Sequence, residues 1–372
     1  MKKLATLLLA ASALTLPAAA SADNHAHKGH TMTETKTTAP LIEREKLFGN
    51  PTRAGGQISP DGQWLSWRAP VNGVMNVWIA PASDPSAAKA ITASTDRPIR
   101  EYFWSPDSKS VMYVQDKGGD ENFLLYGIDI ATGAEKTLTP FEKTRVTLVG
   151  SSTTIKDRIL IGLNNRDARF HDVHMLNLKT GELTLVQENN GYAGFLADNN
   201  LALRMAVRPN AAGGMDYFPI VDGKIAETPS DTTGLEDSLT TNPAGFTTDG
   251  KTMYWIDSRG RNTAALIAQD VATGEKRIVA QNDKADIGGA LSNPKTGEIE
   301  AYSFTYLRTE WTAIDPEIKA SLDWLDSQLE GDFGVQSRTE DDTKWLIWND
   351  SVVAPSKIYL YDRTAKSLSE LY

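Results

Sequence analysis

Few residues in this chain have the type and spacing that covalent catalysis requires. The 372 residues include no cysteine, which excludes thiolate nucleophiles, disulfides and cysteine-based zinc sites. A serine nucleophile exposed at a strand-to-helix corner needs the spacing G-x-S-x-G, and no segment of the sequence has it. The nearest segment, Gly150-Ser151-Ser152-Thr153-Thr154, lacks the closing glycine and lies at a predicted turn between two strands. The sequence therefore predicts no catalytic residue.

The histidines do not form a convincing catalytic or metal-binding group. Only His171 and His174 lie in the predicted folded region, and on a strand a spacing of three places them on opposite faces. His25, His27 and His30 fall in a polar segment, where they could hold a metal ion loosely because imidazole is a common ligand. Ordering a flexible segment around three ligands costs conformational entropy. We therefore interpret this segment as a linker and predict no metal site.

Paired carboxylates and paired glycines are interpreted as turn residues. Asp341-Asp342 and Glu236-Asp237 lie in polar turns, whereas an acid/base pair needs burial to separate its two pKa values. Gly213-Gly214 and Gly288-Gly289 are isolated and do not form a phosphate-binding loop, so no cofactor is predicted. The chain has 38 Lys+Arg against 48 Asp+Glu without a basic stripe, which makes a nucleic-acid partner unexpected.

The N-terminal 22 residues have the features of a secretory signal peptide. Lys2 and Lys3 precede an apolar stretch from Leu4 to Leu16, and the segment ends in a small-x-small cleavage pattern. We predict cleavage after Ala22 and a periplasmic or secreted protein. The apolar stretch is too short for a transmembrane helix and no later stretch approaches 18 residues, so no membrane span is expected after cleavage. Residues 23–40 are predicted to be a disordered, histidine-containing tether.

Two turn phrases recur along the rest of the chain. One follows a short strand, at residues 59–62 (SPDG), 105–108 (SPDS) and 248–250 (TDG). The other separates two later strands, at residues 129–135 (DIATGAE), 177–182 (NLKTGE), 270–275 (DVATGE) and 362–366 (DRTAK). Between the phrases lie short alternating strands rich in aromatic and β-branched residues, typical of half-buried sheets.

The spacing of the second phrase predicts a β-propeller. Gly133 and Gly181 are 48 residues apart, and the next two intervals are 93 and 91 residues, which equal two units each. A period of about 46 residues fits an all-β propeller whose blades are four-stranded antiparallel sheets. The predicted arrangement is a pre-propeller segment, 41–53, then seven blades within residues 54–372. The expected blades are 54–93, 97–140, 143–188, 190–230, 240–281, 284–331 and 332–372.

Two of the predicted blades deviate from the repeat. Blade four has Val221-Asp222-Gly223-Lys224 where the Thr-Gly turn should be. Blade six carries a helical insertion near Pro316 to Leu329, since its apolar residues follow a 3.6-residue period. A six-bladed count is the alternative if one weak unit is misread.

Several phrases resemble bacterial serine peptidases of the prolyl oligopeptidase family, in the acylaminoacyl-peptidase and dipeptidyl-aminopeptidase branch. These phrases are residues 41–51 (LIEREKLFGNP), 164–173 (NNRDARFHDV), 257–266 (DSRGRNTAAL) and 307–311 (LRTEW). The resemblance covers residues 41–372. It implies a propeller that caps an α/β-hydrolase domain and limits entry to short peptides, with a Ser-Asp-His triad supplied by the hydrolase. One propeller face should then carry exposed apolar residues that meet the hydrolase.

The chain departs from the family because no hydrolase motif is present in it. Our hypothesis is that the sequence is a truncated or split gene product, or an excised domain, and is inert by itself. The alternative is a stand-alone periplasmic propeller that binds a protein or ligand, like the propeller of the Tol system, because a fold does not determine its function.

Overall fold

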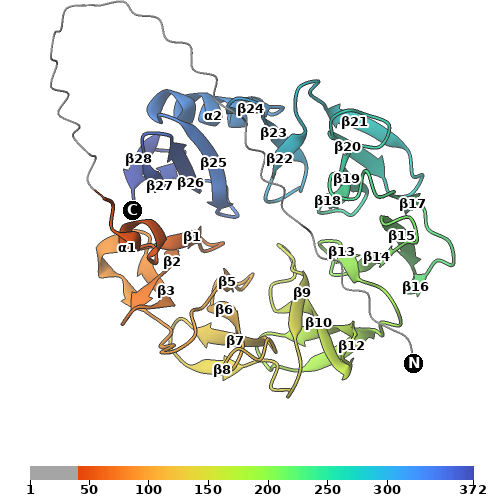
Figure 1. Ribbon diagram of the computed structural model, residues 1–372, viewed down its shortest axis with the longest axis horizontal. Coiled ribbons are helices and arrows are strands. Elements are labelled where there is room, and N and C mark those ends of the chain that lie inside the picture. Colours follow the sequence, from red (N-terminus) through yellow and green to blue (C-terminus); the bar gives the residue numbers. More distant parts are fainter. Residues whose placement is uncertain (1–40) are drawn as a thin grey trace, which may run out of the picture. The chain divides into compact units, whose positions relative to one another are not determined.

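The computed structural model describes residues 41–372, which divide between Gly49 and Asn50 into two units. The predicted signal peptide and histidine-containing tether lie outside the described residues. In the first unit, the short helix α1 (Arg44–Phe48) has no buried residue. The second unit consists of seven antiparallel sheets arranged as blades around a central axis (Figure 1). The predicted seven-bladed propeller is confirmed, and the alternative count of six is wrong.

Five of the seven sheets have four strands, and the first three blades are of this kind. Blade one contains β1 (Ala54–Ile58), β2 (Trp64–Val71), β3 (Val74–Pro81) and β4 (Lys89–Ala90), with the 3-10 helix η1 (Pro85–Ala87) before β4. Blade two contains β5 (Glu101–Trp104), β6 (Ser110–Gln115), β7 (Leu124–Asp129) and β8 (Glu135–Thr137). Blade three contains β9 (Val146–Gly150), β10 (Arg158–Asp167), β11 (Phe170–Asn177) and β12 (Leu183–Gln187).

The remaining blades include the two irregular ones. Blade four contains β13 (Gly194–Ala197), β14 (Leu203–Pro209), β15 (Met215–Val221), β16 (Lys224–Ile225) and β17 (Asp231–Thr232). Blade five contains β18 (Asn242–Phe246), β19 (Thr252–Asp257), β20 (Ala265–Asp270) and β21 (Lys276–Ala280). Blade six contains β22 (Ile287–Ser292), β23 (Ile299–Thr305), β24 (Thr309–Ala313) and helix α2 (Pro316–Gln328). Blade seven contains β25 (Asp332–Arg338), β26 (Lys344–Ser351), β27 (Ala354–Asp362) and β28 (Ser367–Glu370).

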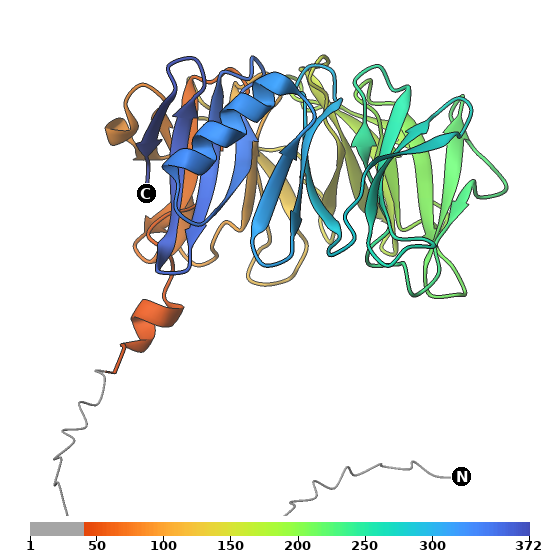
Figure 2. The same ribbon diagram turned by 90° about the horizontal axis from the view of Figure 1, so that it is seen from above.

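Helix α2 replaces the fourth strand of blade six instead of interrupting a complete four-stranded blade. The helix begins where the sequence predicts, because the side chain of Asp315 accepts hydrogen bonds from the backbone N–H groups of Glu317 and Ile318 at 2.7 and 3.1 Å. Its apolar side packs between blades six and seven, with Leu325 fully buried. Figure 2 shows the helix beside the strands of blade six, and Ile318, Leu322 and Leu325 pack in the core cluster shared with blade seven.

The core of the second unit is divided among the interfaces between blades. Seven clusters of buried apolar residues each combine side chains from two adjacent blades. Trp67, Trp255 and Trp345 are the largest fully buried side chains. Each blade thus depends on its two neighbours for burial, as in other repeat architectures.

The ring closes between blade seven and blade one without a shared strand, because all strands of each sheet are consecutive in sequence. The backbone N–H of Ile58 donates to the hydroxyl of Ser337 at 3.0 Å. The N–H of Glu340 donates to the carbonyl of Pro60 at 2.8 Å. Apolar packing of both blades adds to these bonds. Closure therefore rests on side-chain contacts and single hydrogen bonds.

The consecutive antiparallel strands sort the turns onto two faces of the ring, visible from the side in Figure 2. We call one the first-turn face; it carries the turns between the first and second strands. These turns are residues 59–63, 105–109, 151–157, 198–202, 247–251, 293–298 and 339–343. We call the other the crossover face; it carries the turns between the second and third strands and the connections between blades. Its turns are residues 72–73, 116–123, 168–169, 210–214, 258–264, 306–308 and 352–353.

Candidate functional site

The crossover face carries exposed apolar side chains, as the sequence analysis expects of a docking face. Leu307 is 86% exposed and Val353 is 78% exposed, on adjacent blades six and seven. The full set on this face is Leu235, Leu239, Tyr306, Leu307, Val352 and Val353. Near the first-turn face, the corresponding residues are Val221, at the end of β15, and Ile314, after β24. Five further exposed residues lie on strands: Leu148, Leu185, Val186, Ile278 and Trp348. Among the turns and connections, the apolar exposure is therefore greater on the crossover face.

The peptidase-like sequence phrases of blades three, five and six fall on the same face. Residues 164–173 include the turn between β10 and β11, and residues 257–266 include the turn between β19 and β20. Residues 307–311 include the end of the turn between β23 and β24. The first-turn face holds the Ser-Pro-Asp turns, which many propellers share. The specific part of the sequence resemblance thus maps to the crossover face.

Arginine–aspartate ion pairs hold the crossover loops in place. In blade three, Nε and Nη2 of Arg166 donate to the two carboxylate oxygens of Asp172 at 2.7 and 2.8 Å. In blade five, Arg259 makes the same bidentate contact with Asp257. Paired N–H bonds fix the geometry as well as the charge. Further pairs at this face include Arg97–Asp116 and Arg308–Asp332.

These ion pairs also set the protonation of the buried carboxylates. Hydrogen bonds from Arg166 hold the pKa of Asp172 below its usual range. At Asp257, burial alone would raise the pKa, but the hydrogen bonds from Arg259 outweigh it and the pKa lies below its ordinary value. Both aspartates therefore stay ionised and keep the loops positioned near neutral pH.

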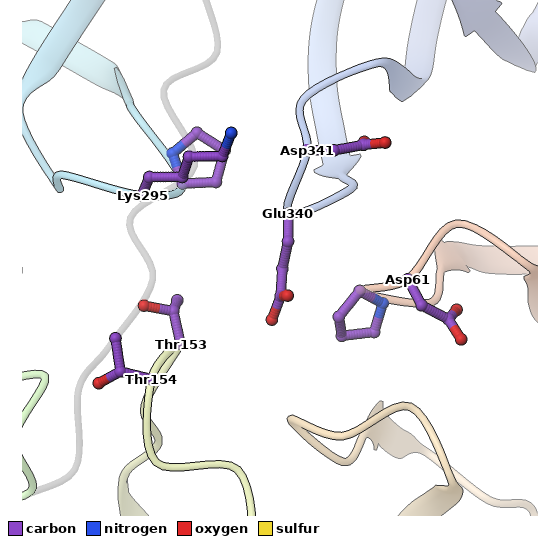
Figure 3. Close-up of a pocket in the computed structure, with 8 residues that line it drawn as sticks. Asp61, Thr153, Thr154, Lys295, Glu340 and Asp341 are labelled. Atoms are coloured by element: carbon purple, nitrogen blue, oxygen red, sulfur yellow. The ribbon is translucent and has the colours of Figure 1, made fainter.

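The first-turn face surrounds a polar cavity of about 380 Å³ at the mouth of the central channel. Figure 3 shows Glu340 extending into the space between Thr153 and Asp61, while Asp341 points away from it. The carboxylate of Glu340 pairs with Nζ of Lys156 at 2.5 Å, which links blade seven to blade three. The cavity is lined by Pro60, Asp61, Thr153, Thr154, Pro294, Lys295, Glu340 and Asp341.

The serine segment 150–154 has a structural role at this mouth. It joins β9 to β10, as the sequence predicts, and does not open a helix. The hydroxyl oxygen of Ser152 accepts hydrogen bonds from the backbone N–H groups of Thr154 and Ile155 at 3.1 and 2.8 Å. Ser152 is buried and thus organises the turn.

The two folded histidines lie on β11 of blade three. Nδ1 of His174 is hydrogen-bonded to the carbonyl of Asp172 at 3.1 Å. Burial lowers the pKa of His171, and Arg145 lowers it further. Nε2 of His171 is buried without a partner among residues 41–372. Neither ring pairs with a serine among those residues, so the structure does not bring these histidines into a catalytic group.

The carboxylate pairs have more varied roles than the sequence suggested. Asp341 caps its own turn, where its side chain accepts from the N–H of Thr343 at 3.0 Å. Asp342 is instead partly buried and forms ion pairs with Arg338 and Arg363. Its carboxylate also accepts a hydrogen bond from Nε1 of Trp345 at 2.6 Å. The side chain of Asp237 accepts a hydrogen bond from the hydroxyl of Ser258 at 2.7 Å. Glu236 is exposed.

Within residues 41–372, no group of three or more His, Cys, Asp or Glu side chains is placed so that it could hold a metal ion. Over the same residues, no helix has the length and apolar character that crossing a membrane requires.

Comparison with known proteins identifies sequence relatives, although no family model matches the chain. The dipeptidyl aminopeptidase BIII of Pseudoxanthomonas mexicana is 47% identical over 333 residues, which are 89% of this chain and 48% of the relative. The dipeptidyl peptidase family member 6 of Caenorhabditis elegans is 29% identical over 348 residues, which are 89% of this chain and 47% of the relative. The chain spans about half the length of the curated relatives it matches.

A solved structure from a mechanistic study of two prolyl endopeptidases has the same fold. It matches 86% of this chain and 49% of the endopeptidase chain, with a TM-score of 0.58 at 11% identity. At that identity the match supports the propeller fold alone, whereas the bacterial sequence relative supports common ancestry.

Proposed function

Because the chain carries a propeller homologous to those of prolyl oligopeptidase-family serine peptidases, we propose that it covers an α/β-hydrolase active site and admits short peptides to it. The observation that carries the proposal is the crossover face, where six large apolar side chains are exposed. Large exposed apolar patches mark protein contacts, and we propose that these residues contribute to one. The peptidase-like phrases lie on the same face, which supports a docking role there.

In this proposal the hydrolase domain catalyses peptide hydrolysis, and the propeller selects which substrates reach the active site. A hydrolase serine would attack the peptide carbonyl, because the 372 residues contain no G-x-S-x-G segment. The bacterial relative is a dipeptidyl aminopeptidase, so we propose that the substrates are short peptides with a free N-terminus. The chain by itself is then inert.

Size selection follows from the dimensions of the channel mouth. A cavity of about 380 Å³ has the volume of a small ligand and not that of a folded protein. The ion pair between Lys156 and Glu340 joins turns of blades three and seven beside this cavity. Substrates would enter here or beside the crossover face only as short, flexible segments.

A chimeric enzyme tests the proposal. Residues 50–372 would replace the matching region of the Pseudoxanthomonas relative, and hydrolysis of a dipeptidyl p-nitroanilide would be compared with cleavage of a long unfolded peptide. We expect the small substrate to be hydrolysed and the long one to be spared. Leu307→Lys should reduce activity because it charges the docking face, whereas Val221→Lys, on the other side of the ring, should not. A folded chimera without activity, or one that cleaves both substrates equally, contradicts the proposal.

The inertness of the chain is tested separately with the purified natural chain. We expect no release of p-nitroaniline from aminoacyl or dipeptidyl substrates. Turnover that a serine-directed inhibitor abolishes would show that a nucleophile is present after all.

We further propose that the chain is exported, with cleavage after Ala22. Mass spectrometry of the chain from a periplasmic fraction should give an N-terminus at Asp23; an uncleaved cytoplasmic chain would refute this. The alternative function is a stand-alone envelope propeller. A pull-down that recovers an envelope protein and no hydrolase would favour that alternative.

A further inference from the structure

A second cavity, of about 560 Å³, lies between blades four and five, away from the channel mouth. In Figure 1 these are the blades labelled β13 to β17 and β18 to β21. Its walls come from β14 and β15 on one side and from β19 and β20 on the other. Ligand-binding clefts have volumes of about 300–1,000 Å³, so its size is suited to a small organic molecule.

The irregular outer edge of blade four leaves this cleft open. Two outer strands of two residues each, β16 and β17, pair with different ends of β15. Pro219 lies between these two pairings and has no N–H to donate to an outer strand. The turn Asp222-Gly223, with φ values of 50° and 72°, is the tight two-residue kind and not the longer Thr-Gly turn of the other blades. Val221 beside it is 66% exposed.

The interior of the cleft is apolar. Met205 and Ile220 from blade four face it, and Met253 and Phe246 from blade five complete the lining. Met205 and Met253 are buried in the cluster between the two blades. Methionine side chains adapt to ligands of different shape. The cleft can therefore bury an apolar body.

A buried amide reaches the cleft with a free donor. Gln269 is 8% exposed and lines the cavity. Its Oε1 accepts the hydrogen bond of Trp255 Nε1 at 2.7 Å, which fixes the orientation of the amide. Within residues 41–372, no hydrogen bond joins Nε2 of Gln269 to another residue, and this atom is accessible from the cleft. The amide can therefore donate a hydrogen bond to a ligand or water there.

A buried carboxylate on the opposite wall has spare acceptor capacity. Asp198 is 5% exposed, and its Oδ1 accepts from the N–H groups of Asn200 and Ala202 at 2.9 and 3.1 Å. Its Oδ2 makes no hydrogen bond with the described residues, and the nearest cation is Arg204 at 3.8 Å. An ionised carboxylate has about four lone-pair sites, so this oxygen can accept from a ligand.

The charge of the lining selects the ligand class. Four aspartates line the cleft against one arginine and one lysine: Asp198, Asp222, Asp249, Asp270, Arg204 and Lys251. We propose that this cleft binds an amphipathic organic cation, with an apolar body between blades four and five and an ammonium group at Asp198. The proposal is independent of the docking role of the crossover face.

The probe is 2-(1-naphthyl)ethylammonium, and its anionic counterpart is 3-(1-naphthyl)propanoate. Both are titrated into the mature chain labelled with ¹³C at its methionine methyl groups. We expect the cation to shift the signals of Met205 and Met253, and the anion to bind at least about tenfold more weakly. No shift at millimolar cation, or equal binding of the two probes, overturns the proposal.

Two substitutions locate the site, and one has a matched control. Asp198→Asn keeps a side-chain oxygen that can accept from the backbone N–H groups, but it removes the negative charge. We therefore expect binding of the cation to weaken about fivefold. Ala272→Trp places a large side chain over the cleft from an exposed turn, and we expect a loss of about tenfold or more. Ala131→Trp makes the same change at the equivalent turn of blade two and should leave binding unchanged. Equal losses in the two tryptophan variants would overturn the assignment.

Discussion

The two faces of the ring are built from the same seven blades, yet their turns use different chemistry. On the first-turn face, four blades repeat one hydrogen-bond pattern between a hydroxyl and an aspartate two residues later. On the crossover face, turns range from two residues in blade seven to eight in blade two, and no ion pair repeats at the same position. The repeated chemistry specifies the fold, whereas the unrepeated chemistry is available for contacts with other molecules.

The repeated hydrogen bonds of the first-turn face stabilise the turns themselves. The hydroxyl of Ser59 donates to Asp61 at 2.6 Å and accepts from the N–H of Trp64 at 2.9 Å. In blade two, Ser105 makes the corresponding bonds with Asp107 and Ser110 at 2.7 and 2.9 Å. Each set closes a turn entirely within its own blade. No partner molecule is needed to satisfy it.

The largest loss of stability is expected on the first-turn face, at Asp342. Asp342→Ala removes the acid partner of Arg363 and one of the two acids that pair with Arg338, the other being Glu300, and it leaves Nε1 of Trp345 without its acceptor. Removing one partner of a buried ion pair costs about 3–5 kcal/mol, so we expect the free energy of unfolding to fall by that amount. Urea denaturation measures it.

The control for Asp342 is an aspartate in an exposed ion pair. Asp323 pairs with Lys319 on helix α2, and both side chains are 63% exposed. Exposed pairs contribute about 0–1 kcal/mol, so Asp323→Ala should change stability little. Equal effects of the two substitutions would show that the cluster around Trp345 is not a stabilising centre of this face.

On the crossover face the largest stability effect is expected at Arg259. Arg259→Met leaves Asp257 buried without its bidentate partner and removes one of two cations from Asp231. Leaving a buried charged acceptor unsatisfied costs about 2–3 kcal/mol. Arg261→Met is the control, because Arg261 is an exposed residue of the same turn and should be replaceable without loss.

The pH dependence of this effect identifies its cause. Since Asp257 has a lowered pKa in the folded state, its stabilisation is present above the unfolded pKa of about 3.9 and is lost as the pH falls through the folded value. The difference in stability between the natural chain and Arg259→Met should therefore be larger near neutral pH and shrink below about pH 4. A difference that persists undiminished in acid would show that lost packing, and not the ion pair, is responsible.

The sequence predicts the turns and the helix, because these features depend on residues that are close together in the chain. The glycines of the second turn phrase adopt positive φ as the turn argument requires, 72° at Gly133 and 75° at Gly274. Blade seven has no glycine there, and Lys366 takes a φ of 46° instead. Helix α2 was also readable, because its cap and apolar period are local.

The features that the sequence analysis missed depend on residues far apart in the chain. The cluster at Asp342 joins Arg338 to Arg363, and Trp345 lies between the two guanidinium groups at 4.9 and 4.8 Å. The cleft between blades four and five exists because β16 and β17 are short and pair with different ends of β15. The exposed apolar residues of the crossover face come from chain segments as far apart as Leu235 and Val353. No local pattern contains these arrangements.

A smaller effect of equal size is expected in two of the repeated turns. Ser59→Ala and Ser105→Ala each remove a buried hydroxyl that bonds both an aspartate and a backbone N–H. We expect each to lower the free energy of unfolding by about 1–2 kcal/mol, and the two values to agree within about 0.5 kcal/mol. Urea denaturation of the two variants checks this. Unequal costs would show that the turns are not energetically equivalent despite their shared geometry.

The smallest effect on stability is expected at Leu307, although its substitution should reduce the activity of the chimera. Leu307 is 86% exposed on the crossover face, so Leu307→Lys should change the free energy of unfolding by less than about 0.5 kcal/mol. Val221→Lys, at 66% exposure near the first-turn face, should be equally neutral. Thermal unfolding of both variants provides the comparison. If Leu307→Lys alone were strongly destabilising, Leu307 would be part of the folded core, and the reduced activity expected of the chimera could not be attributed to docking.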